Sequence, residues 1–67
     1  MEAGWVKIYT SADFFKSEIV KQVLIDHEID IIIINKQGFP YRIGEVEVYI
    51  HENDFQKALE IIVKNEL

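Results

Sequence analysis

The segment EVEVYIH at residues 45–51 decides the fold that we predict for this chain. Successive side chains of a strand point to opposite faces of a sheet, so Val46, Val48 and Ile50 share one face. The other face carries the remaining side chains of the segment, Glu45, Glu47, Tyr49 and His51. This alternation predicts a half-buried strand with one apolar face.

The residues just before this strand predict a hairpin. Residues 36–44 (KQGFPYRIG) hold two of the three glycines and the only proline of the chain, which favours a loop. Residues 30–35 (DIIIIN) contain four consecutive isoleucines, whose β-branched side chains favour a strand. A third strand is expected at residues 5–10 (WVKIYT), where Val6 and Ile8 point to one face and Trp5, Lys7 and Tyr9 to the other.

Helical spacing marks two further segments. Residues 14–28 are predicted to form the first helix, which begins after two candidate N-caps, Ser11 and Asp13. The apolar stripe expected in this first helix consists of Phe15, Ile19, Val20, Val23, Leu24 and His27. Residues 53–65 form the second helix, which begins with a capping box in which Gln56 reaches back to the backbone of Asn53. Its expected stripe consists of Phe55, Ala58, Leu59, Ile62 and Val63.

The order strand, helix, strand, strand, helix defines the topology. A right-handed crossover makes the first two strands parallel, and the third strand fills the gap between them, antiparallel to both. We therefore predict an α+β, ferredoxin-like two-layer sandwich, with a three-stranded mixed sheet of order 1-3-2 and both helices on one face. The usual fourth strand is missing, and residues 1–67 form a single domain.

Length and composition exclude several classes of protein. A domain of 67 residues buries only about 60% of its unfolded surface, and its core supplies roughly 3–5 kcal/mol. The chain has no cysteine for disulfides or thiolate zinc sites, yet 49% of its residues are hydrophobic, so we expect a partner to supply stability. The net charge of −5 disfavours binding to nucleic acid or to anionic membranes. No signal peptide or membrane-length apolar run is apparent, so we expect a cytoplasmic protein.

Five residues of the sheet are candidates for an interaction surface. The first strand lies at an edge, where only Lys7 protects it against pairing with another chain. The face away from the helices combines Trp5, Tyr9 and Tyr49 with Lys7 and Glu47, beside two of the isoleucines. Such a patch favours a homo-oligomer or docking to another protein. The alternative is that these aromatic side chains are merely exposed on a sheet face.

The loop at residues 36–44 is a second candidate site. Lys36, Phe39, Tyr41 and Arg42 concentrate cationic and aromatic groups in an acidic chain. Such a mixture suits a small anionic ligand, which would make the domain a metabolite sensor. The alternative is a structural hairpin loop in which Phe39 and Ile43 pack against the edge of the protein.

No pattern of catalytic, cofactor-binding or metal-ligating residues is found. His27 and His51 have no spacing that implies a shared metal ion, and we expect structural roles for both. Glu45 and Glu47 point the same way, but nothing in the sequence supplies the cleft that paired catalytic carboxylates need. Those glutamates also stand where an RNA recognition motif needs basic residues. We expect a protein that is not an enzyme and needs no cofactor.

The sequence also resembles a known family. The resemblance is carried by residues 5–9 (WVKIY), 35–37 (NKQ) and 44–49 (GEVEVY), by Ser17, Ile19 and Leu24, and by Asp54 and Ala58. On these segments the chain is similar to the short bacterial domains named putative prokaryotic signal-transducing protein. The resemblance implies a fold like that of the PII-type nitrogen regulators, and it implies no established activity, ligand or catalytic residue.

Two departures from that family stand out. Its members often have glycine just before the isoleucine that follows the first helix, where this chain has Glu28. His51 replaces a frequent proline. The long loop and glycine-bearing turns with which PII proteins bind nucleotides are missing here, so nucleotide binding does not carry over.

Overall fold

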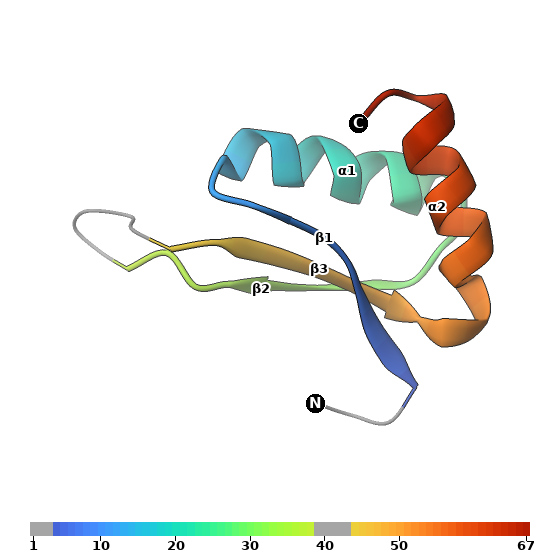
Figure 1. Cartoon of the computed structure of the whole chain (residues 1–67), viewed down its shortest axis with the longest axis horizontal. Helices are drawn as coiled ribbons and strands as arrows, with labels where there is room; N and C mark the ends of the chain where they lie inside the picture. The colour runs from blue at the N-terminus through green and yellow to red at the C-terminus, as the bar shows by residue number, and fades with distance from the viewer. Residues whose placement is uncertain (1–3, 39–43) are drawn as a thin grey trace.

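The structure is a computed structural model that describes residues 4–38 and 44–67. Its elements follow the predicted order: β1 (Trp5–Ser11), α1 (Phe14–Asp26), β2 (Ile31–Asn35), β3 (Val46–His51), the 3-10 turn η1 (Glu52–Asp54) and α2 (Phe55–Lys64). In Figure 1 the two helices are seen above the strands, and α2 rises from the end of β3. Within the described part of the chain, no helix is long and apolar enough to cross a membrane.

The sheet has the predicted strand order, with β3 between β1 and β2. Both hydrogen-bonded pairs are antiparallel, so the sheet is antiparallel and the prediction of a mixed sheet was wrong. The predicted pairing is confirmed, because β3 lies between β1 and β2 and runs antiparallel to both; only the term mixed, which requires parallel neighbours, does not apply. The register of β2 places Ile31 and Ile33 opposite Ile50 and Val48.

The two faces of the sheet differ because of this register. The core face carries Val46, Val48 and Ile50 of β3, all of them fully buried, as their alternation predicted. We call the opposite side the open face, and it carries Ile32, Ile34, Glu47, Tyr49 and His51.

A bulge in β1 changes the side on which Tyr9 lies. Lys7 pairs with Tyr49, whereas Tyr9 pairs with Val48, so Ile8 is an extra residue in β1. A bulge puts two residues of one strand opposite a single residue of its partner, which breaks the strict alternation of side chains. Ile8 and Tyr9 both pack against the core as a result. The prediction that Tyr9 lies on the face away from Ile8 was therefore wrong.

Buried residues of both helices join β3 in one hydrophobic core. The cluster consists of Val20, Leu24, Ile29, Val48, Ile50, Ala58, Ile61 and Ile62. The expected stripes of the helices are only partly correct, because Phe15 and Ile19 of α1 are 77% and 53% exposed. Ser17 is fully buried in their place, and its hydroxyl donates to the carbonyl of Asp13 at 3.2 Å.

The ends of α1 are fixed by local hydrogen bonds. One carboxylate oxygen of Asp13 accepts from the amides of Phe15 and Lys16, which confirms Asp13 as the N-cap. The helix ends two residues before the predicted boundary because Glu28 takes a left-handed conformation with φ of 63°. The Glu28 amide donates to Ile25 and the Ile29 amide to Leu24, which is the Schellman pattern. This turn carries Ile29 into the core.

The predicted capping box of α2 is wrong. Asn53 lies inside η1, rather than in the extended backbone that an N-cap usually adopts. The Gln56 side chain does not reach back but donates to Glu60, one turn further along α2.

Candidate functional site

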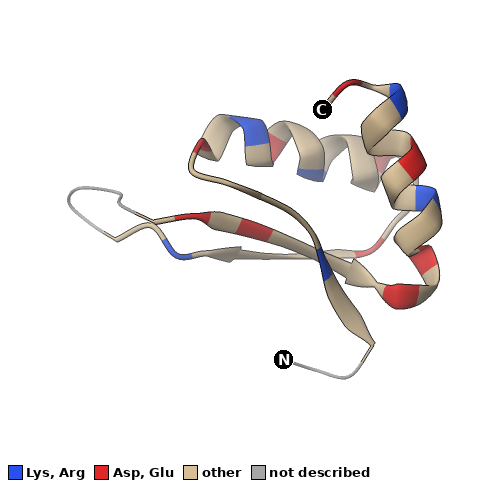
Figure 2. Ribbon diagram, in the orientation of Figure 1, with Lys and Arg blue, Asp and Glu red and all other residues tan. Residues whose placement is uncertain are grey.

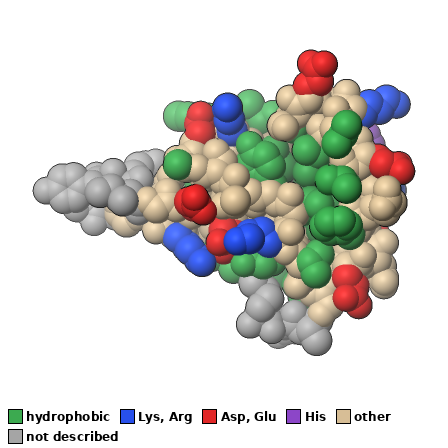
Figure 3. Space-filling model, in the orientation of Figure 1, with side chains coloured by type: hydrophobic (Ala, Val, Ile, Leu, Met, Phe, Trp, Pro, Cys, Tyr) green, Lys and Arg blue, Asp and Glu red, His purple; other side chains and the backbone are tan. Residues whose placement is uncertain are grey.

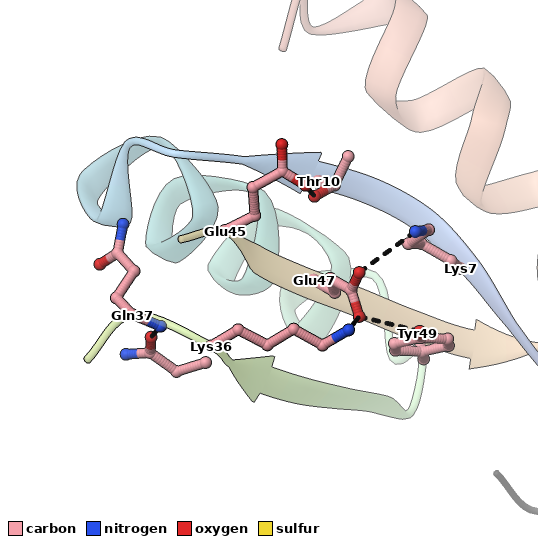
Figure 4. A network of polar contacts seen from close by, with 8 residues as sticks. Lys7, Thr10, Lys36, Gln37, Glu45, Glu47 and Tyr49 are labelled. Carbon is pink, nitrogen blue, oxygen red and sulfur yellow. Dashed lines mark hydrogen bonds and ion pairs between the residues drawn. The ribbon is translucent and has the colours of Figure 1, made fainter. Parts of the chain in front are cut away.

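Glu47 is the centre of a polar network on the open face. Its side chain is only 7% exposed although it lies opposite the hydrophobic core. The ammonium nitrogens of Lys7 and Lys36 each lie 3.2 Å from a Glu47 carboxylate oxygen, and the Tyr49 hydroxyl donates at 3.0 Å. Figure 4 shows these side chains converging from β1, from the residue after β2 and from β3.

The three donors keep Glu47 ionised. Hydrogen bonds from Lys36, Lys7 and Tyr49 lower the pKa of the Glu47 carboxyl below its ordinary value. The hydrogen bond to Glu47, together with its charge, raises the pKa of Lys7. A carboxylate held by three donors is a poor proton acceptor, so this arrangement suits a structural role more than acid–base catalysis.

A second set of contacts closes the base of the loop. The amide of Gln37 donates to the Asn35 side chain at 2.8 Å, and the Gln37 side chain donates to the carbonyl of Ala12 at 2.6 Å. Gly44 has a φ of 125°, and a Cβ there would lie 2.6 Å from the carbonyl oxygen of Lys36. Only glycine fits this close approach without a shift of the backbone.

These contacts bring together the two segments that carry most of the family resemblance, residues 35–37 and 44–49. Lys36 binds Glu47 through its side chain and Glu45 through its backbone amide. On the other side, the Thr10 hydroxyl donates to Glu45 at 3.1 Å. The motif therefore ties three strands together at one end of the hairpin.

Four of the five predicted interaction residues lie together on the open face. Lys7, Glu47 and Tyr49 belong to the polar network, and Trp5 stacks on His51 with ring centroids 4.2 Å apart. Tyr9 does not join them because of the β1 bulge. The open face therefore combines this polar network with half-buried apolar side chains, among which are Trp5, Ile32, Ile34 and Tyr49.

The candidate ligand loop is described only in part. Phe39, Tyr41 and Arg42 lie outside the described residues. Lys36 is described, and its ammonium group is bound to Glu47. The structure does show a groove of about 380 Å³ elsewhere, between α1, β1 and the C-terminal residues. It is lined by Tyr9, Lys16, Ile19, Val20, Glu66 and Leu67.

An apolar stripe on α2 is the surface that the sequence prediction missed. Phe55, Leu59 and Val63 follow one another at intervals of four residues and are 39%, 39% and 69% exposed. The prediction placed all three in the core, but Ala58, Ile61 and Ile62 occupy it. Figure 3 shows hydrophobic side chains gathered along α2 and continuing onto β1. Six of the ten residues of α2 are apolar. This wide apolar arc could have indicated that part of the helix surface stays exposed.

The strand that α2 contacts, β1, lies at an edge of the sheet. β1 pairs with β3 on one side, and no strand within residues 4–38 and 44–67 pairs with its other side. α2 contacts β1 as well as α1. An unpaired strand edge and an exposed apolar helix surface therefore belong to adjoining elements.

Among the described residues, no group of three or more His, Asp or Glu side chains is placed to hold a metal ion. Comparison with known proteins identifies the family of this chain. Searches of curated proteins and of solved structures found no match. The family model described as putative prokaryotic signal transducing protein matches residues 5–66. The chain therefore belongs to this family, as its sequence motifs predicted.

Proposed function

We propose that this chain is a non-enzymatic interaction domain of a signal-transducing system, and that it associates with itself through its sheet. In this proposal the fold is a ferredoxin-like arrangement that lacks its fourth strand. That strand would normally cover the outer side of β1. A partner chain takes its place.

The unpaired edge of β1 carries the proposal. Backbone amides and carbonyls at a strand edge form a template for pairing with another chain. Natural proteins protect such edges with charged residues, proline or β-bulges, and β1 has one lysine, Lys7, and the bulge at Ile8. The ammonium group of Lys7 is already engaged by Glu47. Pairing with a second chain would satisfy the outward backbone groups.

The polar network supports a binding function over a catalytic one. Glu47, the most buried acid of the described chain, has its carboxylate occupied by two lysines and a tyrosine. A general base must be free to accept a proton from a substrate. Glu47 therefore serves better to stiffen a binding sheet than to perform chemistry.

Light scattering after size-exclusion chromatography tests the proposal directly. The chain has a mass of 7.9 kDa, so a dimer has twice that mass. We expect the measured mass to fall from the dimer to the monomer value as the protein is diluted from high to low micromolar concentration. A monomer at every concentration would refute self-association.

The small-ligand function stays a weaker alternative. Lys36 is the one member of the candidate loop site that is described, and its charge is already matched by Glu47. No described contact therefore favours an anionic ligand at this loop over a structural role.

A further inference from the structure

We infer that the groove between α1, β1 and the residues that follow α2 binds a small apolar amino acid as its zwitterion. In this site Lys16 binds the carboxylate of the ligand and Glu66 binds its ammonium group, while apolar side chains of the groove contact the rest of the ligand. The inference goes beyond the proposed self-association and does not depend on it. The site is also separate from the open face and from the hairpin loop.

The groove has the size of a site for a small molecule. Its volume of about 380 Å³ lies near the lower end of the range of roughly 300–1,000 Å³ that is typical of ligand pockets. Buried Val20 and half-buried Leu67 contribute apolar lining, and Ile19 is 53% exposed beside them. A ligand that covers Ile19 would remove apolar surface from water. The groove therefore suits a small ligand with an apolar side chain.

The bulge in β1 provides one wall of the groove. Strict alternation along β1 would turn Tyr9 towards the open face, but the extra residue Ile8 turns it towards the core. Tyr9 lines the groove as a result. Bulges are frequent beside binding sites, where they change the direction of a side chain. The irregularity of β1 and the groove are therefore parts of one feature.

The turn after α2 provides the opposite wall. Glu66 takes a left-handed conformation with φ of 56°, which is uncommon for a residue other than glycine. The Glu66 amide donates to Val63 at 3.1 Å and the Leu67 amide donates to Ile62 at 3.0 Å, which is the Schellman pattern. This turn packs Leu67 against the core and places Glu66 at the groove. In Figure 1 the chain after α2 turns back towards α1.

Opposite charges line this one groove. Lys16 comes from α1 and Glu66 from the turn after α2, and both residues are exposed. Figure 2 shows basic positions along α1 and an acidic position in the turn that follows α2. Neither residue belongs to the three ion pairs found among residues 4–38 and 44–67. Both charges are therefore available to a ligand.

A zwitterion matches this pair of charges better than a simple acid or a simple amine. Hydrogen bonds between ionised groups are roughly twice as strong as those between neutral groups, and an amino acid can form one with each residue. A simple anion would engage only Lys16 and would be repelled by a chain whose net charge is −5. A simple cation would engage only Glu66. An apolar amino acid supplies both charges and the apolar side chain that the groove suits.

NMR titration of the isotope-labelled chain with L-leucine tests the inference. We expect amide shifts that saturate and that map to α1, to Tyr9 and to the turn at Glu66 and Leu67. Two matched probes each lack one charge: isocaproate has no ammonium group, and isoamylamine has no carboxylate. Each should bind at least about 10-fold more weakly than L-leucine, because one charge-assisted hydrogen bond is lost.

Charge variants assign the two residues. Lys16→Gln should weaken the binding of L-leucine at least about 10-fold. Lys57→Gln is the matched control and should leave the affinity unchanged, because Lys57 is an exposed lysine of α2 that does not line the groove. The control alters the net charge by the same amount. Glu66→Gln should weaken the binding of L-leucine but not that of isocaproate, which has no ammonium group to lose.

Several results would overturn the inference. L-leucine that gives no saturable shift, or shifts only residues away from the groove, would show that this site does not exist. Isocaproate that binds as tightly as L-leucine would contradict recognition of a zwitterion. Lys16→Gln that binds L-leucine as tightly as Lys57→Gln would contradict the role of Lys16. None of these results bears on self-association, which light scattering measures separately.

Discussion

Replacing Glu28 by glycine should stabilise the domain by about 1 kcal/mol. Glu28 is exposed and holds a left-handed backbone with φ of 63° at the end of α1. A residue with a Cβ atom loses roughly 1–2 kcal/mol in this conformation, and glycine does not. The greater freedom of glycine in the unfolded chain offsets about 0.4–1 kcal/mol of that gain. Removing an acid from the negative end of the helix dipole adds about 0.3–1 kcal/mol.

The assay is thermal unfolding followed by circular dichroism. For a domain of this size, 1 kcal/mol corresponds to a rise in Tm of about 4–8 °C. Chemical denaturation should show the same gain as a higher midpoint with an unchanged slope, because the core is untouched.

Glu28→Ala separates the two causes. Alanine removes the charge but keeps the Cβ atom, so it should gain only the electrostatic part. The reasoning fails if alanine stabilises as much as glycine, because backbone strain would then play no part. It also fails if glycine lowers Tm, because the Schellman turn would then depend on the Glu28 side chain.

The hairpin and its loop give three further predictions. Because the pKa of Glu47 is lowered in the folded state, its contribution to stability is present above the ordinary carboxyl pKa of 4.5 and is lost as the pH falls through the folded value. Glu47→Gln should therefore lower Tm at neutral pH, and its Tm should change less than that of the wild type in a titration to acidic pH; parallel curves would contradict this account. Gly44→Ala should lower Tm, since its new Cβ would meet the Lys36 carbonyl oxygen at 2.6 Å, and an unchanged Tm would show that the backbone can move aside. A thermal-shift screen of anionic metabolites and nucleotides should leave Tm unchanged, whereas a ligand at 100 times its dissociation constant would add about 2.7 kcal/mol and would favour the sensor function.

Much of the fold could be predicted from local patterns. The alternation of residues 45–51 predicted which side chains of β3 are buried, because a strand with one covered face has a period of two. Asp13 was recognisable as a cap because its short carboxylate precedes a helical apolar pattern. The strand order followed from chain connectivity, which leaves one gap for the third strand.

The errors have physical causes that the sequence does not display. The bulge at Ile8 depends on how β1 bends across β3, and no glycine or proline marks it. The burial of Glu47 depends on two lysines that reach it from other segments, whereas alternation alone predicted an exposed acid. Ser17 is buried in α1, where its hydroxyl donates to the carbonyl of Asp13, and the predicted apolar stripe did not include it.

The candidate surface was predicted less well than the fold. The edge of β1 was recognised from the strand order, and β1 is indeed an edge strand of the sheet. The α2 stripe was missed because Phe55, Leu59 and Val63 were assigned to the core, whereas the buried Ile61 was not. The three strands found in residues 4–38 and 44–67 leave part of this apolar arc exposed.

Amide hydrogen exchange at the edge of β1 tests the central claim most directly. β1 and β2 are both edge strands, so β2 serves as an internal control in the same sample. We predict that the outward amides of β1 exchange more slowly at high protein concentration than at low concentration, while those of β2 exchange at a constant rate. Exchange in β1 that is independent of concentration would contradict pairing at this edge.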